Sequence, residues 1–256
     1  MRHDEEAFAP EHSSWIDSID LVDSVLVSTG SRCDDTGDGG WTIIVRRHDL
    51  STGAEVWQRT LAQQQPLVSM GAIAIAGDQL LVAGTSGTTR VQGRFLAAYN
   101  LSGTLLWAQE DKPTSVTAWN DVRQIGGEDF ILTGLAKGDG NDYRLVLRRI
   151  GPNGEERWTN ESELGTALSG SSVAVGPGDE IAVAANTLTG NHWQAHTLRF
   201  ASDGSLRWTS EDEGSTSLGA QAWNAAIGAG SIAVTGVEDT MDVWVDEARV
   251  RVFAFE

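Results

Sequence analysis

Short apolar runs recur along the chain, each introduced by polar turn residues and most of them closed by glycine. The runs are rich in Val, Ile and Leu without strict alternation, which is typical of strands covered on both faces. Their spacing of about 50 residues indicates five copies of one structural unit. The five runs are DSVLVSTG (23–30), DQLLVAG (78–84), EDFILTG (128–134), DEIAVAA (179–185) and GSIAVTG (230–236).

A tryptophan follows four turn glycines at a constant distance. Trp57, Trp107, Trp158 and Trp208 each come four residues after a glycine, and they recur every 50 or 51 residues. The segments before them are typical of hairpins that need a glycine with positive φ. We therefore expect each tryptophan to lie on the strand after its hairpin and to fill the gap between neighbouring units.

Each unit has room for four strands. A weaker strand pattern precedes each apolar run, and two strands joined by the hairpin follow it. Repeats of this length and strand content predict the blades of a β-propeller. We expect a single all-β domain over residues 1–256, a five-bladed β-propeller of four-stranded antiparallel blades. The predicted blades cover 13–62, 66–112, 115–163, 166–214 and 217–256, the last completed by 1–12.

The fifth unit provides three strands, and its missing strand has a candidate at the other end of the sequence. A ring that lacks an edge strand would leave backbone groups unpaired, which closed β architectures avoid. Residues 1–12 contain DEEAFAP, which resembles GEERWTN of the third unit, and Phe8 lies 49 residues before Trp57. We therefore expect the N-terminal strand to close the last blade, and we expect a monomer.

Charge and composition narrow the class of partner. With 36 acidic against 18 basic residues the net charge is -18, which disfavours nucleic acid and favours cations or basic partners. No apolar run of 18 residues could cross a membrane, and Cys33 is the only cysteine, which excludes an intrachain disulfide. The compartment stays open, with the periplasm or the cell exterior favoured if a signal peptide has been removed.

One hairpin carries a family resemblance. The segment Asp49–Trp57, DLSTGAEVW, resembles the PQQ-like repeat of bacterial β-propellers, whose hairpin has Asp, then Thr-Gly, then Trp. The other three hairpins are similar to looser relatives in exported bacterial propeller-repeat proteins. The resemblance implies a propeller fold and a periplasmic or surface location. It does not extend to the quinone cofactor, because quinoprotein dehydrogenases have eight blades and an adjacent-cysteine pair that this sequence lacks.

Acidic residues gather in the loops predicted for one face of the ring. The loops between second and third strands share that face with the connections between blades, so the face should be strongly negative. The acidic residues of these loops are Asp34, Asp35, Asp38, Glu110, Asp111, Asp139, Asp142, Glu161, Glu163, Glu211, Asp212, Glu213, Glu238, Asp239 and Asp242.

The longest of these loops, SRCDDTGDGGW (31–41), is the candidate metal site. It holds Asp34, Asp35 and Asp38 with three glycines, and oxygen-rich loops bent by glycine suit Ca²⁺. Its spacing does not match the EF-hand loop, and acidic glycine-rich turns are commonly solvated surface loops. A Ca²⁺ site is thus the alternative to a solvated loop, and we expect no other cofactor.

An aromatic residue opens the third strand in four units, at Trp41, Tyr143, Trp193 and Trp244. Aromatic side chains at a junction of loop and strand can stack on sugars, which makes these four the candidate ligand-binding residues. Packing beneath the loops is the alternative interpretation. Their differing sequence neighbours argue against identical binding sites in every blade.

Two carboxylates on innermost strands are the candidate catalytic pair. Asp17 and Asp121 follow Trp15 and Trp119, and glycoside hydrolysis needs paired carboxylates. The fifth unit has Ala225 at the matching place, which weakens the pattern. We therefore expect a non-catalytic binding or scaffold module that recognises a protein or carbohydrate partner through the acidic loop face. A polysaccharide-acting hydrolase is the alternative.

Overall fold

The computed structural model describes ten stretches of the chain. They are 14–33, 41–61, 67–87, 92–111, 117–137, 143–162, 168–189, 191–214, 219–238 and 247–255.

The described residues form nineteen β-strands in five antiparallel groups that follow chain order, with one 3-10 turn at Pro177–Asp179. Blade 1 consists of β1 (Ser14–Val22), β2 (Val25–Cys33), β3 (Trp41–Asp49) and β4 (Glu55–Leu61). Blade 2 consists of β5 (Leu67–Ala76), β6 (Gln79–Gly87), β7 (Gln92–Asn100) and β8 (Leu105–Asp111). Blade 3 consists of β9 (Ala118–Ile125), β10 (Asp129–Lys137), β11 (Tyr143–Ile150) and β12 (Glu156–Ser162). Blade 4 consists of β13 (Ser169–Val175), β14 (Ile181–Thr189), β15 (His192–Phe200) and β16 (Leu206–Asp212). The described part of blade 5 consists of β17 (Ala220–Gly228), β18 (Ser231–Glu238) and β19 (Glu247–Ala254).

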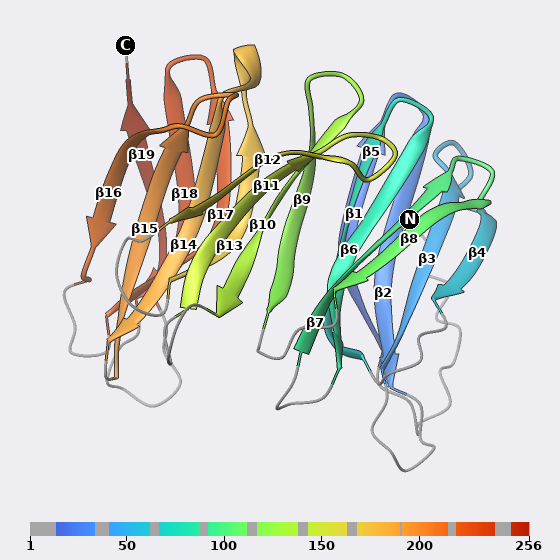
Figure 1. Cartoon of the computed structure of the whole chain (residues 1–256), viewed down its shortest axis with the longest axis horizontal. Coiled ribbons are helices and arrows are strands. Elements are labelled where there is room, and N and C mark those ends of the chain that lie inside the picture. The colour runs from blue at the N-terminus through green and yellow to red at the C-terminus, as the bar shows by residue number, and fades with distance from the viewer. Residues whose placement is uncertain are drawn as a thin grey trace.

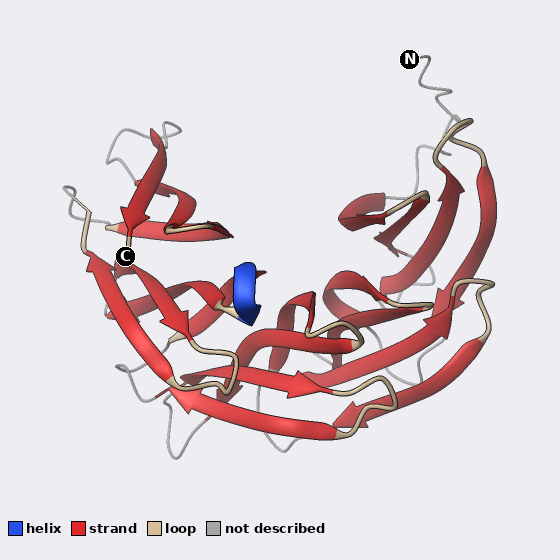
Figure 2. Cartoon of the chain, turned by 90° about the horizontal axis from the view of Figure 1, so that it is seen from above, coloured by secondary structure: helices blue, strands red, loops and turns tan. Residues whose placement is uncertain are grey.

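The blades stand side by side in an arc, with β1, β5, β9, β13 and β17 as the innermost strands (Figures 1 and 2). Each innermost strand contacts the innermost strand of the next blade, and blades 1 and 5 lie at the two ends of the arc. The predicted all-β architecture of four-stranded antiparallel blades is therefore confirmed, whereas the described residues form an open arc. The closing strand predicted in residues 1–12, with Phe8, lies outside the described residues.

The hydrophobic core is divided among the four junctions between blades. Val27 and Val45 of blade 1 pack with Ile73 of blade 2, and separate buried clusters fill the next three junctions. The first junction also contains a single backbone bridge between Trp41 and Leu67, which joins the sheets of blades 1 and 2. No described blade has a core of its own, so each depends on its neighbours, as in other repeat architectures.

The repeating tryptophan holds the next blade by its hairpin. The indole Nε1 of Trp57 donates to the carbonyl of Leu101 at 3.0 Å. Trp107 donates in the same way to Pro152 at 2.7 Å. Each acceptor sits two residues before the hairpin glycine of the following blade, and we call this contact the tryptophan clasp. Trp158 repeats the clasp on the carbonyl of Ser202 at 3.2 Å.

The clasp explains why the hairpin needs glycine. It also predicts that substitutions at two turn glycines should lower the free energy of unfolding by different amounts. Gly204 has φ +81°, and a Cβ there would lie 2.8 Å from the Trp158 ring; Gly127 has φ +85° with open space around it. Both alanine variants require a left-handed backbone, but only Gly204→Ala must also displace the indole. We expect losses in unfolding free energy of about 2 to 3 kcal/mol for Gly204→Ala and about 1 kcal/mol for Gly127→Ala. Urea unfolding measures both losses. Equal losses would show that the Trp158 indole moves aside without lowering the free energy of unfolding.

The first hairpin should contribute to the folding stability by an amount that depends on pH. The Asp49 carboxylate accepts hydrogen bonds from the backbone N–H groups and hydroxyls of Ser51 and Thr52. These bonds lower the pKa of Asp49 from 3.8 to about 2. Because the pKa of Asp49 is lower in the folded state, its stabilisation is present above pH 3.8 and is lost as the pH falls through about 2. The stability difference between the wild type and Asp49→Ala should therefore shrink over that range in thermal unfolding.

Asn100 provides the matched control for this acid effect. It occupies the same place in blade 2 and accepts from Ser102 and Thr104 through an amide that does not ionise. Asn100→Ala should therefore destabilise the protein by an amount that does not change over this pH range. A parallel acid dependence for both variants would contradict the assignment to the Asp49 carboxylate.

Candidate functional site

Asp121 is a buried structural link between blades 3 and 4. Its carboxylate accepts from the Ser172 hydroxyl at 2.9 Å and the Val173 backbone N–H at 3.0 Å, both in blade 4. It also accepts from the Val122 N–H at 2.9 Å and pairs with Arg123 at 3.2 Å. Burial raises the pKa of Asp121, with the Arg123 charge and the hydrogen bonds opposing the shift. The carboxylate is thus surrounded by protein donors.

Asp17 has a similar role at the junction of blades 1 and 2. Its carboxylate accepts from the Ser31 hydroxyl and from the backbone of Gly71, while burial raises its pKa. The strand register differs from the predicted equivalence, because Asp17 lies in a β-bulge whose counterpart in blade 3 is Asn120. Asp17 and Asp121 therefore occupy different register positions in blades separated by blade 2, and each is directed at the following blade.

Two of the predicted aromatic residues are half-buried at the start of a third strand, and their backbones tether the next blade. The Tyr143 carbonyl accepts from the Leu168 N–H at 3.1 Å, and Trp193 forms a backbone bridge with Gly219. The Trp41 bridge to Leu67 is the same kind of connection. The aromatic position thus coincides with the backbone tether between blades.

Other predicted site residues fall outside the described residues. These are Asp34, Asp35 and Asp38 of the candidate Ca²⁺ loop and the aromatic residue Trp244. Among the described residues no group of three His, Cys, Asp or Glu side chains could hold a metal ion. In the same part of the chain, no helix is long and apolar enough to cross a membrane. The Ca²⁺ site stays a prediction, and calorimetric titration with Ca²⁺ tests it.

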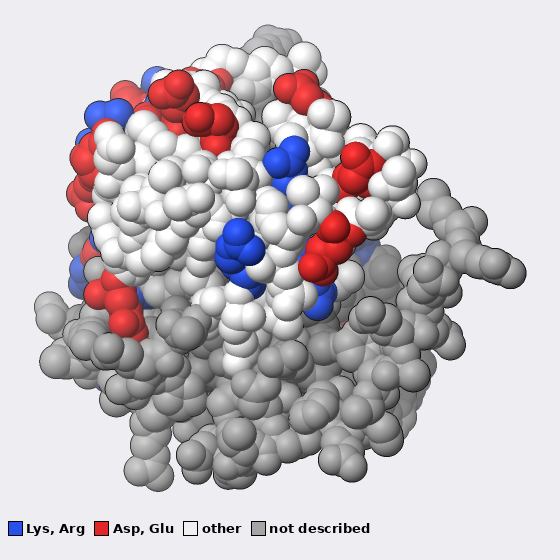
Figure 3. Space-filling view, turned by 90° about the vertical axis from the view of Figure 1, so that its right-hand side faces the viewer, with Lys and Arg blue, Asp and Glu red and all other residues white. Residues whose placement is uncertain are grey.

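The residues of the predicted acidic face differ in exposure, and some of them form ion pairs. Glu110, Glu161 and Glu211 are exposed at the same end of the outermost strands of blades 2, 3 and 4. Three acidic residues of this face form ion pairs: Glu161 with Arg144 at 3.9 Å, Asp212 with Arg251 of blade 5, and the buried Glu238 with Arg249. On the side that carries β3 and β4, basic and acidic side chains are interspersed among uncharged ones (Figure 3).

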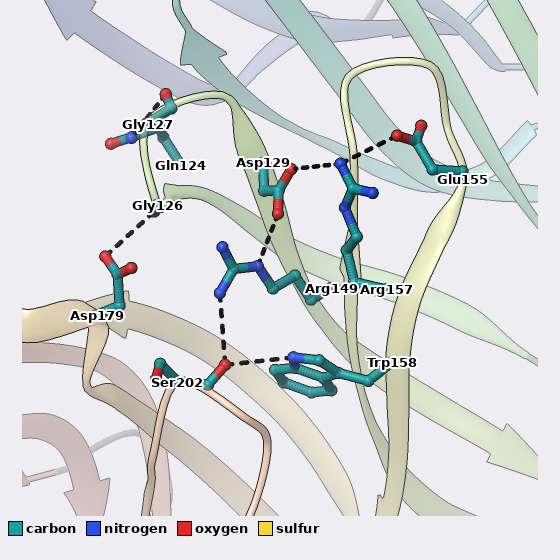
Figure 4. Close-up of polar contacts among 10 residues, drawn as sticks. All are labelled: Gln124, Gly126, Gly127, Asp129, Arg149, Glu155, Arg157, Trp158, Asp179 and Ser202. Atoms are coloured by element: carbon teal, nitrogen blue, oxygen red, sulfur yellow. Dashed lines mark hydrogen bonds and ion pairs between the residues drawn. The ribbon is translucent and has the colours of Figure 1, made fainter.

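At the hairpin end of the blades, arginines that the sequence patterns did not single out reinforce the tryptophan clasp. Arg149 donates to the Ser202 carbonyl at 3.4 Å, alongside Trp158, and its other side meets Asp129 at 2.8 Å (Figure 4). Asp129 also pairs with Arg157 at 3.4 Å. The same Arg–Trp arrangement recurs in blade 1, where Arg47 donates to the Leu101 carbonyl at 2.7 Å.

The junction of blades 4 and 5 departs from this arrangement. Arg199, which matches Arg149 in register, lies over the Phe255 ring at 3.7 Å, and Trp208 meets Phe253 edge-on at 5.1 Å. These side chains line an open groove of about 360 Å³. Trp208 is 37% exposed, in contrast to 9% for Trp57. The groove occupies the place where the other junctions have a covered clasp.

Comparisons with known proteins yield structural neighbours only. No family model matches the chain, and no curated protein matches it. The β-propeller domain of the Trilobed protease from Pyrococcus furiosus is similar with a TM-score of 0.44 and 10% identity, over 95% of this chain and 82% of that chain. Pyrococcus horikoshii acylaminoacyl peptidase is similar with a TM-score of 0.43 and 10% identity, over 94% of this chain and 45% of that chain.

This chain therefore spans less than half of the length of the acylaminoacyl peptidase. At such TM-scores the likeness adds no weight to what the strand order and the blade packing establish. On that structural basis the chain is an all-β protein with the architecture of a β-propeller. The resemblance of one hairpin to PQQ-like repeats stays a prediction.

Proposed function

We propose that this protein is a non-catalytic β-propeller module that binds a partner through its acidic loop face. The observation that carries the proposal is the engagement of both candidate catalytic carboxylates by protein donors. A hydrolase needs one carboxyl group free to donate a proton and a second free to act on the sugar or on water. The carboxylate oxygens of Asp121 instead accept hydrogen bonds from Ser172, Val173 and Val122, which supports a structural role.

The charge of the loop face favours a basic protein as the partner. Glu110, Glu161 and Glu211 repeat at one end of three consecutive blades, and the net charge of -18 adds long-range attraction for cations. Binding that depends on such exposed charges weakens as salt screens them. An exported location, in line with the PQQ-like hairpin at Asp49–Trp57, belongs to the same proposal.

A carbohydrate is the second candidate partner, on one specific observation. Tyr143 and Trp193 are half-buried rather than fully buried, so each keeps part of its aromatic surface accessible at the start of a third strand. Aromatic faces of this kind stack on sugar rings. A glycan array with hydrolysis assays on every hit separates sugar binding from turnover, and turnover would contradict the non-catalytic proposal.

A pair of triple variants tests the acidic face. Glu110→Gln, Glu161→Gln and Glu211→Gln together remove three charges from the loop face while keeping side-chain size. The control Asp23→Asn, Asp78→Asn and Glu128→Gln removes three exposed charges from the turns between first and second strands, at the opposite ends of these strands.

The probe is a lysine-rich peptide titrated at low and at high salt. We expect the loop-face variant to bind about tenfold more weakly at low salt, equivalent to about 1.4 kcal/mol, and the control to bind like the wild type. Equal weakening in both variants would show that only net charge matters and would contradict a localised binding face.

A further inference from the structure

The innermost strand of each blade carries a side chain that faces the preceding blade, and its exposure differs at one end of the arc. This side chain is fully buried in blades 2, 3 and 4 and half-buried in blade 5, but 62% exposed in blade 1. The strand register makes the five positions equivalent. In the order blade 2 to blade 5 and then blade 1, the residues are Ile73, Val122, Val173, Ala225 and Ile19.

Two neighbours of Ile19 share its exposure. Ile16 is 70% exposed, whereas its counterpart in blade 3, Trp119, is 1% exposed. Leu21 is 52% exposed, whereas its counterpart in blade 2, Ile75, is 1% exposed. We call Ile16, Ile19 and Leu21 the leading end face. It has the register of a blade surface that receives a preceding blade.

The opposite end of the arc shows the complementary surface. The third strand of each blade carries a side chain that faces the following blade. Its exposure is 5% or less in blades 1 to 4 and 69% in blade 5. In blade order the residues are Val45, Leu96, Leu147, Thr197 and Val250.

Val252 and Trp223 extend this second surface, with exposures of 67% and 49%. Val252 matches Arg47 of blade 1 in register. Trp223 lies in the bulge of β17, at the position that Asn120 has in blade 3. The Asn120 amide donates to the Gly170 carbonyl of the next blade. We call Trp223, Val250 and Val252 the trailing end face. The side chains that define both end faces are apolar, and by register they match the two sides of the junctions between neighbouring blades.

We propose that the occupant of each end face is a second copy of this chain, with the trailing end face of one copy docked on the leading end face of the next. Within one molecule the two faces lie at opposite ends of the arc (Figure 2). Bringing them together there would require a change at one or more of the four buried junctions. A second copy brings the matching half without altering any of them.

The existing junctions resist such changes because specific bonds hold them. The Asn186 amide bonds both the N–H and the carbonyl of Ala222 across blades 4 and 5, at 2.6 and 2.8 Å. The Asp20 carboxylate accepts from the Ile75 N–H at 2.7 Å across blades 1 and 2. An intermolecular junction of the same kind is head-to-tail, because different faces of the two copies meet.

The strand predicted in residues 1–12 lies outside the described residues, and the proposal does not rest on it. The proposal does not depend on the identity of the partner bound by the loop face.

Light scattering coupled to size-exclusion chromatography tests the assembly. We expect the wild type to contain two chains or more, at low and at high salt, because apolar faces are not weakened by screening. Ile19→Asp and Val250→Asp should each yield single chains. Leu105→Asp, which changes a similarly exposed residue (51%) of blade 2, should behave like the wild type.

Mixing the two end-face variants decides the geometry. Ile19→Asp keeps an intact trailing end face and Val250→Asp keeps an intact leading end face, so the mixture should form a two-chain species through one junction. Circular dichroism verifies folding, and Ile19→Ser with Val250→Ser repeats the test if an aspartate variant fails to fold.

Three results would overturn the proposal. They are a wild type that remains a single chain at every concentration, an assembly that both end-face variants leave unchanged, and a mixture that stays monomeric. A single chain whose melting temperature falls in both variants would instead show that the end faces meet within one molecule.

Discussion

Replacing Trp57 with alanine should lower the free energy of unfolding by about 3 to 5 kcal/mol, the largest effect expected of any substitution considered. The indole is 9% exposed in the junction of blades 1 and 2, and its Nε1 bonds the Leu101 carbonyl at 3.0 Å. Alanine removes the apolar contact and leaves the carbonyl to Arg47 alone. Urea unfolding followed by tryptophan fluorescence and circular dichroism measures the loss.

Trp208 provides the control for this prediction. It occupies the same place in the repeat but is 37% exposed beside Phe253. Trp208→Ala should cost about 1 kcal/mol, the typical value of an aromatic pair at a partly exposed site. Equal losses for the two variants would mean that the clasp contributes no more than exposed aromatic contact does.

Removing the Asp121 side chain should cost about 4 kcal/mol, because Asp121→Ala leaves the Ser172 hydroxyl and the Val173 N–H buried without an acceptor. The loss should appear in unfolding experiments, while binding at the loop face is retained. Asn120→Ala, next to it in the sequence, removes a side chain that is mostly exposed and should cost about 1 kcal/mol. Loss of binding in a folded Asp121 variant would contradict its structural assignment.

The pH dependence of Asp121 has the opposite sign to that of Asp49. Burial raises the folded pKa of Asp121 above 3.8, so its contribution to stability is fully present below 3.8 and declines as the pH rises through the raised value. The stability of the wild type relative to Asp121→Asn should therefore fall with rising pH in that window. A difference that rises with pH would contradict the raised pKa.

The repeat-level features could be predicted from the sequence because they are local and periodic. The apolar runs became the second strands of the blades, and the four turn glycines have positive φ in hairpins. The positions of Trp57, Trp107 and Trp158 between blades follow from the same period. These patterns depend on strand alternation and turn geometry, which neighbouring residues determine.

The register of the innermost strands could not be predicted in the same way. The expected equivalence of Asp17 and Asp121, which follow Trp15 and Trp119, was wrong by one residue, because strand pairing matches Trp119 with Ile16. That shift separated Asp17 from Asp121 in register. The partners of Asp121 lie about 50 residues farther along the chain, so no local pattern indicates that its oxygens are already engaged.

The arginines of the clasp show the same limit. Arg47 and Arg149 lie at equivalent strand positions, yet their acceptors are backbone carbonyls, which leave no trace in side-chain patterns. The candidate Ca²⁺ loop is a different case, since Asp34, Asp35 and Asp38 lie outside the described residues and only titration can decide between its two interpretations.

The tryptophan clasp also gives the array a direction. At the first three junctions one blade contributes an indole and the next contributes a glycine turn, so an additional blade could be inserted among blades 1 to 4 without new chemistry. Growth by duplication of about 50 residues would conserve every existing junction. Unfolding should correspondingly start at blades 1 and 5, each of which packs against one described blade, and amide exchange should be slowest in blade 3.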